Sequence, residues 1–347
     1  MKQCTHIKRL CDSLLVSAIL LVVSCSMDDE LMTCPYNVQL EYWYSQEGTK
    51  QQNMINNYIY DIIEYIFDED NILYAIQKLP GTSERGKYYS EMTLPPGRYT
   101  AVAWGNLSGN TPEFNPTIGQ TTKETMVIRL GIPDNAANET PQPGEIRQNI
   151  GRIYYAFSAF TVQDKSISRI RMGMTHAHCL LDITVKWKAN TPPNTRNFRL
   201  QLREVPGVYH MDPAYGSSIN GPVKIPVTDY PVSNRNAIYY IPTIEESKEL
   251  QRHQAEARMD ITRTLKGQII THRYRNNSQI LFSVYAAEEQ LTKEIDLQKY
   301  FQTMNIDRDR NLRQEFHIVV EVQTDQILVY PAIQSDWENG GVIGGDL

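Results

Sequence analysis

The sequence predicts an all-β protein built from two antiparallel β-sandwich domains, with one or two short helices in the second. Apolar and polar residues alternate over many short segments, and Pro, Gly and Asn separate these segments. The chain contains 21 tyrosines, a residue type that favours strands. Its 347 residues are enough to bury two hydrophobic cores.

Residues 1–24 have the pattern of a signal peptide. Lys2, Lys8 and Arg9 form a basic start, residues 14–23 form an apolar run, and the small Ser24 follows. A membrane-spanning helix needs about 20 apolar residues, and this run is about half as long. The segment is therefore expected to direct export and to be removed, rather than to span a membrane.

Cys25 follows in a context that resembles the lipobox of bacterial lipoproteins. Val22-Val23-Ser24-Cys25 has a branched apolar residue three positions before the cysteine and a small residue directly before it. The resemblance implies cleavage between Ser24 and Cys25 and lipid on the Cys25 thiol. The acidic segment 26–30 resembles the signal that sends lipoproteins of Bacteroidetes to the outer face of the outer membrane. The alternative is an ordinary signal peptide with an incidental cysteine.

Residues 25–37 are predicted to be a tether, and residues 38–132 the N-terminal β-sandwich domain. A first strand opens this domain. It places four apolar side chains on one face: Val38, Leu40, Tyr42 and Tyr44.

The segment 60–67 fits a helix face as well as a strand. The turn signal at 68–71 and the apolar run 72–76 favour a hairpin, so a strand is predicted. A proline-rich turn at 94–97 leads to a strand over 98–104. A strand at 126–130 is expected to be the last strand of the N-terminal domain.

Residues 133–148 have no apolar periodicity and are predicted to link the two domains, with a long loop as the alternative. Residues 149–347 are then the C-terminal β-sandwich domain. Helical spacing or polarity predicts helices at 245–257 and 296–304. The remaining periodic segments predict strands at 169–174, 179–187, 198–204, 237–241, 259–265, 280–285, 315–322 and 326–333.

The charge balance argues against nucleic acid as a partner. The formal net charge is −6, and it becomes −8 without residues 1–24, which carry three basic side chains and one acidic one. No basic stripe offsets this excess. With Cys4 and Cys11 removed and Cys25 acylated, only Cys34 and Cys179 remain, and their pairing is left open.

The sequence contains none of the common local motifs of hydrolases, zinc proteases or nucleotide-binding enzymes, so no catalytic activity, cofactor or metal is expected. His176 and His178 would share one face of a strand, which makes a zinc site conceivable. No third ligand lies nearby in the sequence. They are therefore expected to be polar strand residues beside a core.

Two other patterns have a structural and a functional interpretation. Residues 307–311 imitate the start of a calcium loop, but Leu312 and Ile318 replace the required Gly and Glu, so a solvated turn is predicted. The tryptophans could line a sugar-binding face, yet aromatic side chains on strands are usually core residues. The four are Trp43, Trp104, Trp187 and Trp337.

Several short motifs together resemble the FimB-type fimbrial anchor subunits of Bacteroidales. They are Phe67-Asp68-Glu69-Asp70, Leu94-Pro95-Pro96-Gly97-Arg98-Tyr99 leading to Ala103-Trp104-Gly105-Asn106, and Ser335-Asp336-Trp337. The resemblance spans most of the mature chain and implies two transthyretin-like β-sandwich domains without catalytic activity. It also implies a place at the base of a fimbrium in the outer membrane. The implied partners are other fimbrial subunits and, through lipid on Cys25, the membrane.

The resemblance also implies assembly by strand exchange or edge pairing. In pilins of the wider group, a trypsin-like protease removes an N-terminal strand, and a neighbour's strand fills the groove left behind. Here no Lys or Arg lies between Cys25 and Thr49. This favours an anchor that keeps both its lipid and its first strand. A cut at Lys50 would instead remove the strand, and an arginine-specific enzyme would first meet Arg85.

The glycine-rich segment 337–347 predicts a flexible tail, with a contact to the next subunit as the alternative. Two other functions stay open. One is a stalk or tip pilin of the same system. The other is a surface glycan-binding lipoprotein, which only the aromatic residues support.

Overall fold

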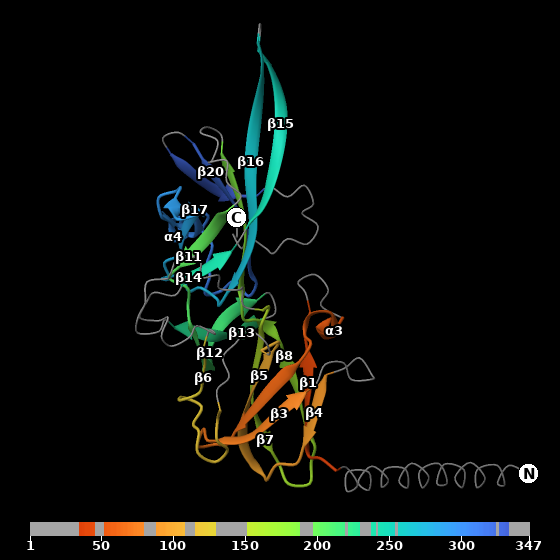
Figure 1. Ribbon diagram of the computed structural model, residues 1–347. Coiled ribbons are helices and arrows are strands. Elements are labelled where there is room, and N and C mark those ends of the chain that lie inside the picture. Colours follow the sequence, from red (N-terminus) through yellow and green to blue (C-terminus); the bar gives the residue numbers. More distant parts are fainter. Residues whose placement is uncertain are drawn as a thin grey trace, which may run out of the picture.

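The computed structural model describes residues 35–45, 52–79, 88–107, 115–129, 151–187, 197–218, 221–229, 237–240, 242–253, 256–323 and 326–332. Strands dominate these residues, and the two helices among them are short. Figure 1 shows two β-sandwiches arranged end to end, with one long hairpin projecting beyond the second. The all-β prediction is therefore confirmed.

The first sandwich packs a five-stranded sheet against a three-stranded one. Both sheets contribute alternate side chains to one buried core. The five-stranded sheet has the order β3 (Leu73–Leu79), β2 (Ile62–Phe67), β5 (Gly97–Gly105), β7 (Tyr154–Val162), β9 (Thr175–His176). The three-stranded sheet has the order β4 (Tyr89–Met92), β1 (Val38–Trp43), β8 (Ser168–Gly173).

The second sandwich has two five-stranded sheets and the helix α4 (Leu297–Thr303), which the side chain of Asp296 caps. One sheet has the order β15 (Thr243–His253), β16 (Glu256–Thr271), β10 (Cys179–Trp187), β20 (Gln314–Val322), β21 (Ile327–Pro331). The other has β14 (Ala237–Tyr240), β11 (Phe198–Arg203), β17 (Leu281–Ala286) and β18 (Glu289–Gln290), with β19 (Ile295–Asp296) beside β17.

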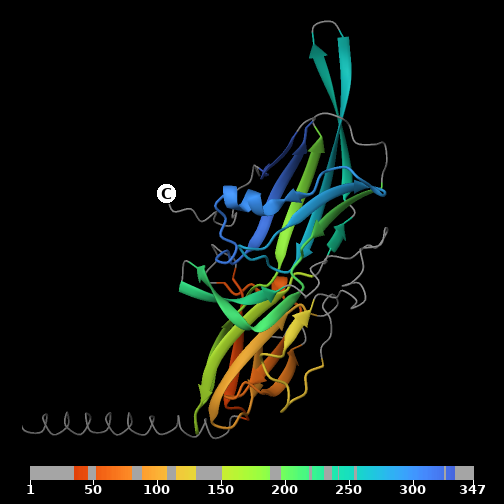
Figure 2. The ribbon, with the colours of Figure 1, turned by 90° about the vertical axis from the view of Figure 1, so that its left-hand side faces the viewer.

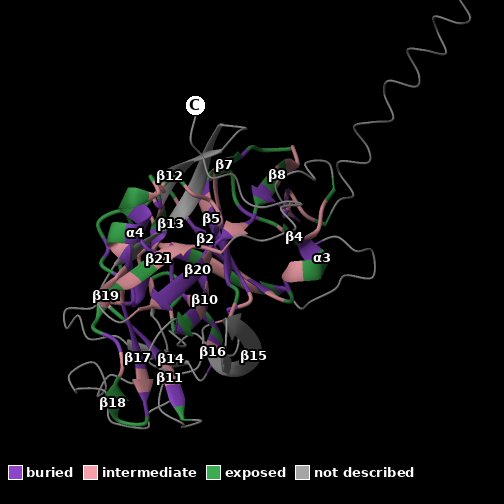
Figure 3. Cartoon of the chain, turned by 90° about the horizontal axis from the view of Figure 1, so that it is seen from above, coloured by how far each residue is buried: buried purple, intermediate pink, exposed green. Residues whose placement is uncertain are grey.

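A third, small sheet, which we call the bridging sheet, joins the two sandwiches (Figure 2). It consists of β13 (Gly221–Asp229), β12 (Val208–Ser218) and β6 (Val127–Arg129). Tyr209 on β12 lies against Trp104 on β5, with 5.3 Å between ring centroids. The five-stranded sheet of the first sandwich is therefore covered on both faces, which explains why β2 and β5 are almost continuously buried (Figure 3).

Most predicted strands are confirmed within a few residues. The ambiguous segment 60–67 is indeed a strand, β2, which forms a hairpin with β3. It begins at Ile62, because Tyr60 is 70% exposed and follows a short helix, α3 (Ile55–Tyr58). The Asp68 side chain accepts hydrogen bonds from the backbone N–H groups of Asp70 and Ile72, which closes the turn as the sequence suggested.

One element prediction is wrong in its type, and another is right in its type but wrong in its place in the fold. Residues 245–257 do not form a helix but lie in the hairpin of β15 and β16, whose register runs from Thr243↔Lys266 to His253↔Glu256. The strand expected at 126–130 does not complete the first sandwich, because β6 pairs with β12 in the bridging sheet. One helix, α3, belongs to the first sandwich rather than the second.

The predicted domain boundary does not agree with the strand pairing. Residues 133–148 lie outside the described residues. Beyond them, β7 pairs with β5 along its whole length and β8 pairs with β1. The first sandwich therefore takes strands from both sides of the expected linker and extends to β9. Two of the strand pairs, β1 with β8 and β10 with β20, are parallel, whereas the other described pairs are antiparallel.

Candidate functional site

The first strand, β1, fills a groove between β4 and β8, which we call the first-strand groove. It pairs antiparallel with β4 from Val38↔Met92 to Glu41↔Tyr89, and parallel with β8 along its whole length. The hydrogen bonding continues beyond both ends of the strand: Asn37 N–H donates to the carbonyl of Met92 at 3.1 Å, and the carbonyl of Trp43 accepts from Met174 at 2.7 Å. Without β1, two strand edges would be left unpaired.

The side chains of β1 confirm the predicted alternation. Val38, Leu40 and Tyr42 have no exposed surface, and Tyr44 just beyond the strand is 4% exposed. They pack into the core between the two sheets of the first sandwich. The intervening residues are only partly buried. The first-strand groove therefore selects a strand with large apolar side chains at every second position.

A buried carboxylate connects β1 with both sheets of the first sandwich. The hydroxyls of Tyr42 on β1 and Ser90 on β4 donate to Glu64 Oε2 on β2, at 2.5 and 2.7 Å. Glu64 has no exposed surface, and its Oε1 atom has no hydrogen-bond partner. Burial raises the pKa of Glu64 above its ordinary value, although the two hydroxyl donors oppose this shift.

A Glu64→Gln substitution should remove a pH dependence of stability. Because the pKa of Glu64 is higher in the folded than in the unfolded chain, the folded chain holds more protons as the pH rises above the ordinary value of 4.5. The free energy of unfolding of the native chain should therefore fall as the pH rises through this window, and Gln should abolish this part of the fall. Urea unfolding at about pH 5 and about pH 7 measures it.

The control for this experiment is Glu91→Gln, which changes an exposed carboxylate on β4. This variant should keep the pH dependence of the native chain. If Glu64→Gln and the native chain lose the same free energy of unfolding between the two pH values, Glu64 does not titrate as described.

The end of β1 reaches the junction between the two sandwiches. Asn53 fixes this end, since its side chain donates to the carbonyl of Tyr42 at 3.0 Å and accepts from the N–H of Tyr44 at 3.1 Å. The hydroxyl of Tyr44 lies 2.6 Å from Nε2 of His176. His176 ends β9, the last strand of the first sandwich. The first strand is thus connected directly to the junction.

Three side chains from separate parts of the chain meet at this junction: His176, His178 and Glu315, which we call the junction cluster. His178 directly precedes β10, and Glu315 lies near the start of β20. Because β10 and β20 are parallel, with Leu180 opposite Glu315, the beginnings of both strands lie side by side. Glu315 is far from both histidines along the chain, so no local sequence pattern indicates it as a third ligand.

The junction cluster is buried and combines two imidazole rings with a carboxylate. His178 has no exposed surface and His176 is 6% exposed. Burial, followed by the neighbouring His178, lowers the pKa of His176 well below its ordinary value. Burial alone would raise the pKa of Glu315, but the adjacent His178 ring and the Arg313 guanidinium hold it below its ordinary value. These are groups that can ligate a metal ion.

Arg273 holds the second sandwich to this junction. Its guanidinium, which is almost fully buried, donates to the carbonyl of His176 at 3.1 Å, to that of Leu312 at 2.8 Å and to that of Asn311. One buried cation thus joins the end of β9 to the segment that precedes β20. Buried charges require such partners.

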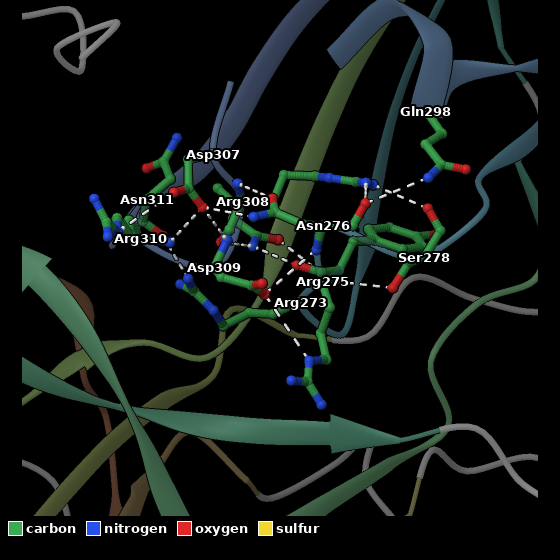
Figure 4. Close-up of polar contacts among 12 residues, drawn as sticks. Arg273, Arg275, Asn276, Ser278, Gln298, Asp307, Arg308, Asp309, Arg310 and Asn311 are labelled. Carbon is green, nitrogen blue, oxygen red and sulfur yellow. Dashed lines mark hydrogen bonds and ion pairs between the residues drawn. The ribbon is translucent and has the colours of Figure 1, made fainter. Parts of the chain in front are cut away.

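The turn at 307–311, which imitates a calcium loop, is less solvated than predicted. Arg308 is 1% exposed and donates to the carbonyls of Asn276 at 2.6 Å and Ser278 at 3.2 Å (Figure 4). Asp307 Oδ1 accepts from the N–H groups of Asp309 and Arg310, both at 3.1 Å, so the carboxylate stabilises its own turn. The turn packs against the loop before β17.

The structure locates only some of the residues that the sequence singled out. Trp104 and Trp187 are core residues, as expected. Cys179 is a buried free thiol, and burial raises its pKa to about 12. Several predicted positions lie outside the described residues: Ser24, Cys25, Cys34, Lys50, Arg85 and Trp337. Within the described part of the chain, no helix has the length and apolar character needed to cross a membrane.

A comparison with known protein families identifies the family of this chain. The model of the fimbrillin-A associated anchor proteins Mfa1 and Mfa2 matches residues 31–339. The chain belongs to this family. The resemblance to fimbrial anchor subunits is therefore confirmed, and the family is one of structural and anchor proteins rather than a known enzyme family. None of the curated protein sequences compared with this member is significantly similar to it.

Solved structures of bacterial proteins share the fold of this Mfa1/Mfa2 family member. The fimbrial anchor protein Mfa2 from Porphyromonas gingivalis superposes with a TM-score of 0.54 at 18% identity, over 85% of this chain and 95% of that one. A candidate adhesin from Bacteroides thetaiotaomicron gives 0.57 at 14%, over 85% and 96%. A candidate polysaccharide-binding protein from the same species gives 0.58 at 14%, over 87% and 99%.

Proposed function

We propose that this chain is a lipid-anchored fimbrial subunit that attaches a fimbrium to the outer membrane through Cys25. Membership of the anchor family supports an association with fimbriae and adhesion. The observation that carries the finer role is the position of β1. It is the central strand of its sheet and is bonded on both edges, and no basic residue precedes it in the mature chain.

The distance along the chain fits this role. About 12 residues lie between Cys25 and Val38, and an extended chain of that length spans at most roughly 40–45 Å. In an uncleaved chain, β1 is held in the first-strand groove and is also covalently continuous with the lipid on Cys25. Pulling on the fimbrium would then load the β1 hydrogen bonds along the strand rather than break a noncovalent contact with the membrane.

The partner in this proposal is a pilin subunit, bound by edge pairing or by donation of a strand. The described edge strand β3 pairs with one neighbouring strand, β2, and has two exposed apolar side chains, Tyr74 at 40% and Ile76 at 38%. Its first residue, Leu73, is already bonded to Thr121 and Gly119, so a partner strand would pair beyond it. An extended segment of a partner could pair there and cover both side chains.

The alternative within the same system is a stalk or tip pilin. Cleavage after Lys50 would separate β1 from the rest of the chain and free the first-strand groove for a neighbour's strand. The glycan-binding alternative has weaker support, because Trp104 and Trp187 lie in the core and are not available to a sugar.

The proposed function is tested by deleting the gene for this chain and measuring whether fimbriae stay on the cells or appear in the medium. Cells without the chain should release intact fimbriae into the medium, and the native sequence supplied in trans should restore attachment. Fimbriae that stay attached and normal after deletion would contradict an anchoring role.

A further inference from the structure

Three buried atoms without a hydrogen-bond partner lie close together in the junction cluster. They are His176 Nδ1, His178 Nε2 and Glu315 Oε1. The ligand atoms of the three side chains lie within 4.8 Å of one another. Proteins pair nearly all of their buried polar atoms, and single exceptions usually have a local cause. Three exceptions that face one another indicate one shared ligand.

The outer contacts of each side chain direct its free atom toward this shared point. His178 Nδ1 lies 2.9 Å from the carbonyl of Ile153, which can only accept, so Nδ1 carries the hydrogen and Nε2 keeps its lone pair. His176 Nε2 can donate to the hydroxyl of Tyr44, which leaves the lone pair on Nδ1. Arg313 donates to Glu315 Oε2 at 2.8 Å and leaves Oε1 free. Such outer contacts are typical of metal ligands.

The distances fit a shared ion better than direct hydrogen bonds. Glu315 Oε1 lies 3.6 Å from His176 Nδ1 and 3.9 Å from His178 Nε2. Both separations exceed the usual hydrogen-bond limit of about 3.2 Å. Ligand atoms about 2.0–2.1 Å from a tetrahedral Zn²⁺ are roughly 3.4 Å apart, so a small inward movement of the side chains is sufficient.

We propose that His176, His178 and Glu315 bind one divalent transition-metal ion, with Zn²⁺ as the best match. Two imidazoles and one carboxylate are a ligand set that zinc accepts, whereas calcium and magnesium prefer oxygen ligands alone. The negative charge of the Glu315 carboxylate would partly neutralise the two positive charges of the ion. The fourth position of a tetrahedral ion would be taken by water.

The ion joins three parts of the fold. His176 ends the last strand of the first sandwich, His178 opens the second, and Glu315 lies on β20. Tyr44, directly after β1, is the outer partner of His176. The ion therefore fixes the junction between the sandwiches and, through Tyr44, the end of the first strand. This inference does not depend on lipid attachment or on the identity of the fimbrial partner.

The test measures zinc in the full-length protein, purified from a detergent extract of whole cells, stripped with chelator and dialysed against micromolar Zn²⁺. Elemental analysis should find one zinc per native chain, and chelation should lower the melting temperature. His176→Gln, His178→Gln and Glu315→Gln should each lose the bound zinc. Tyr44→Phe, which removes only an outer partner, should weaken binding by about tenfold to a hundredfold.

His272→Gln is the matched control, because His272 is another fully buried imidazole that lies outside the junction cluster. It should keep one zinc per chain even if it lowers stability. X-ray absorption of the native zinc complex should show two imidazoles and no sulfur ligand, a result that does not depend on the folding of any variant. A native chain that binds no zinc, a sulfur ligand, or zinc retained by all three cluster variants would overturn the proposal.

Discussion

A Cys25→Ala substitution should move the protein from the outer membrane to the medium and take the fimbriae with it. Lipid on Cys25 is the only attachment in the proposed function, and two acyl chains are needed for stable anchoring because a single chain binds only marginally. Cell fractionation and electron microscopy of the medium measure both effects.

Cys34→Ala is the matched control, since Cys34 lies in the same tether but not after Ser24. This variant should stay in the membrane fraction with its fimbriae. Cys25→Ala protein that remains in the membrane at the native level would show that attachment does not use this cysteine.

A Leu40→Asp substitution should unfold the first sandwich. Leu40 has no exposed surface and packs into the core beneath the first-strand groove. Loss of a buried leucine side chain costs about 2–5 kcal/mol, and an unpaired buried carboxylate adds several more. The sum is comparable with the whole stability of a typical domain, which is about 5–15 kcal/mol. Urea unfolding and limited proteolysis should both detect the change.

Glu41→Asp is the control for this change, because it also places an aspartate on β1 but on the partly buried face. Its unfolding midpoint should stay close to the native value. A complementary experiment removes residues 25–45 and adds a peptide of residues 36–45, which contains β1 and should restore protection against protease. The same peptide with Leu40→Asp should not. Equal stability of Leu40→Asp and the native chain would show that β1 does not fill the groove.

The sequence predicted the first strand better than the junction. The period-two pattern of Val38, Leu40 and Tyr42 is a local property, so it identified both β1 and its buried face. The junction cluster depends on parallel pairing of β10 with β20, which no local pattern of His178 or Glu315 reveals. Long-range pairing also determines the domain boundary. β7 pairs with β5 and β8 pairs with β1, and both of these partner strands precede residue 133.

The failed helix at 245–257 has a different cause. Its residues are polar nearly all round, which gives no period-two signal for a strand. The structure places them in the hairpin of β15 and β16, which extends beyond the second sandwich (Figure 1). There the pairing of two backbones supplies the regular structure.

The most direct test of the anchoring account is the mass of the mature N-terminus, measured on protein taken from the outer membrane of cells with assembled fimbriae. The account predicts a chain that begins at Cys25, carries acyl chains and includes β1. A lipidated N-terminal peptide covering residues 25–50 and continuous with residue 51 would confirm it. A free N-terminus at Gln51 would contradict it, because that chain would have lost both its lipid and its first strand, as a polymerising pilin does.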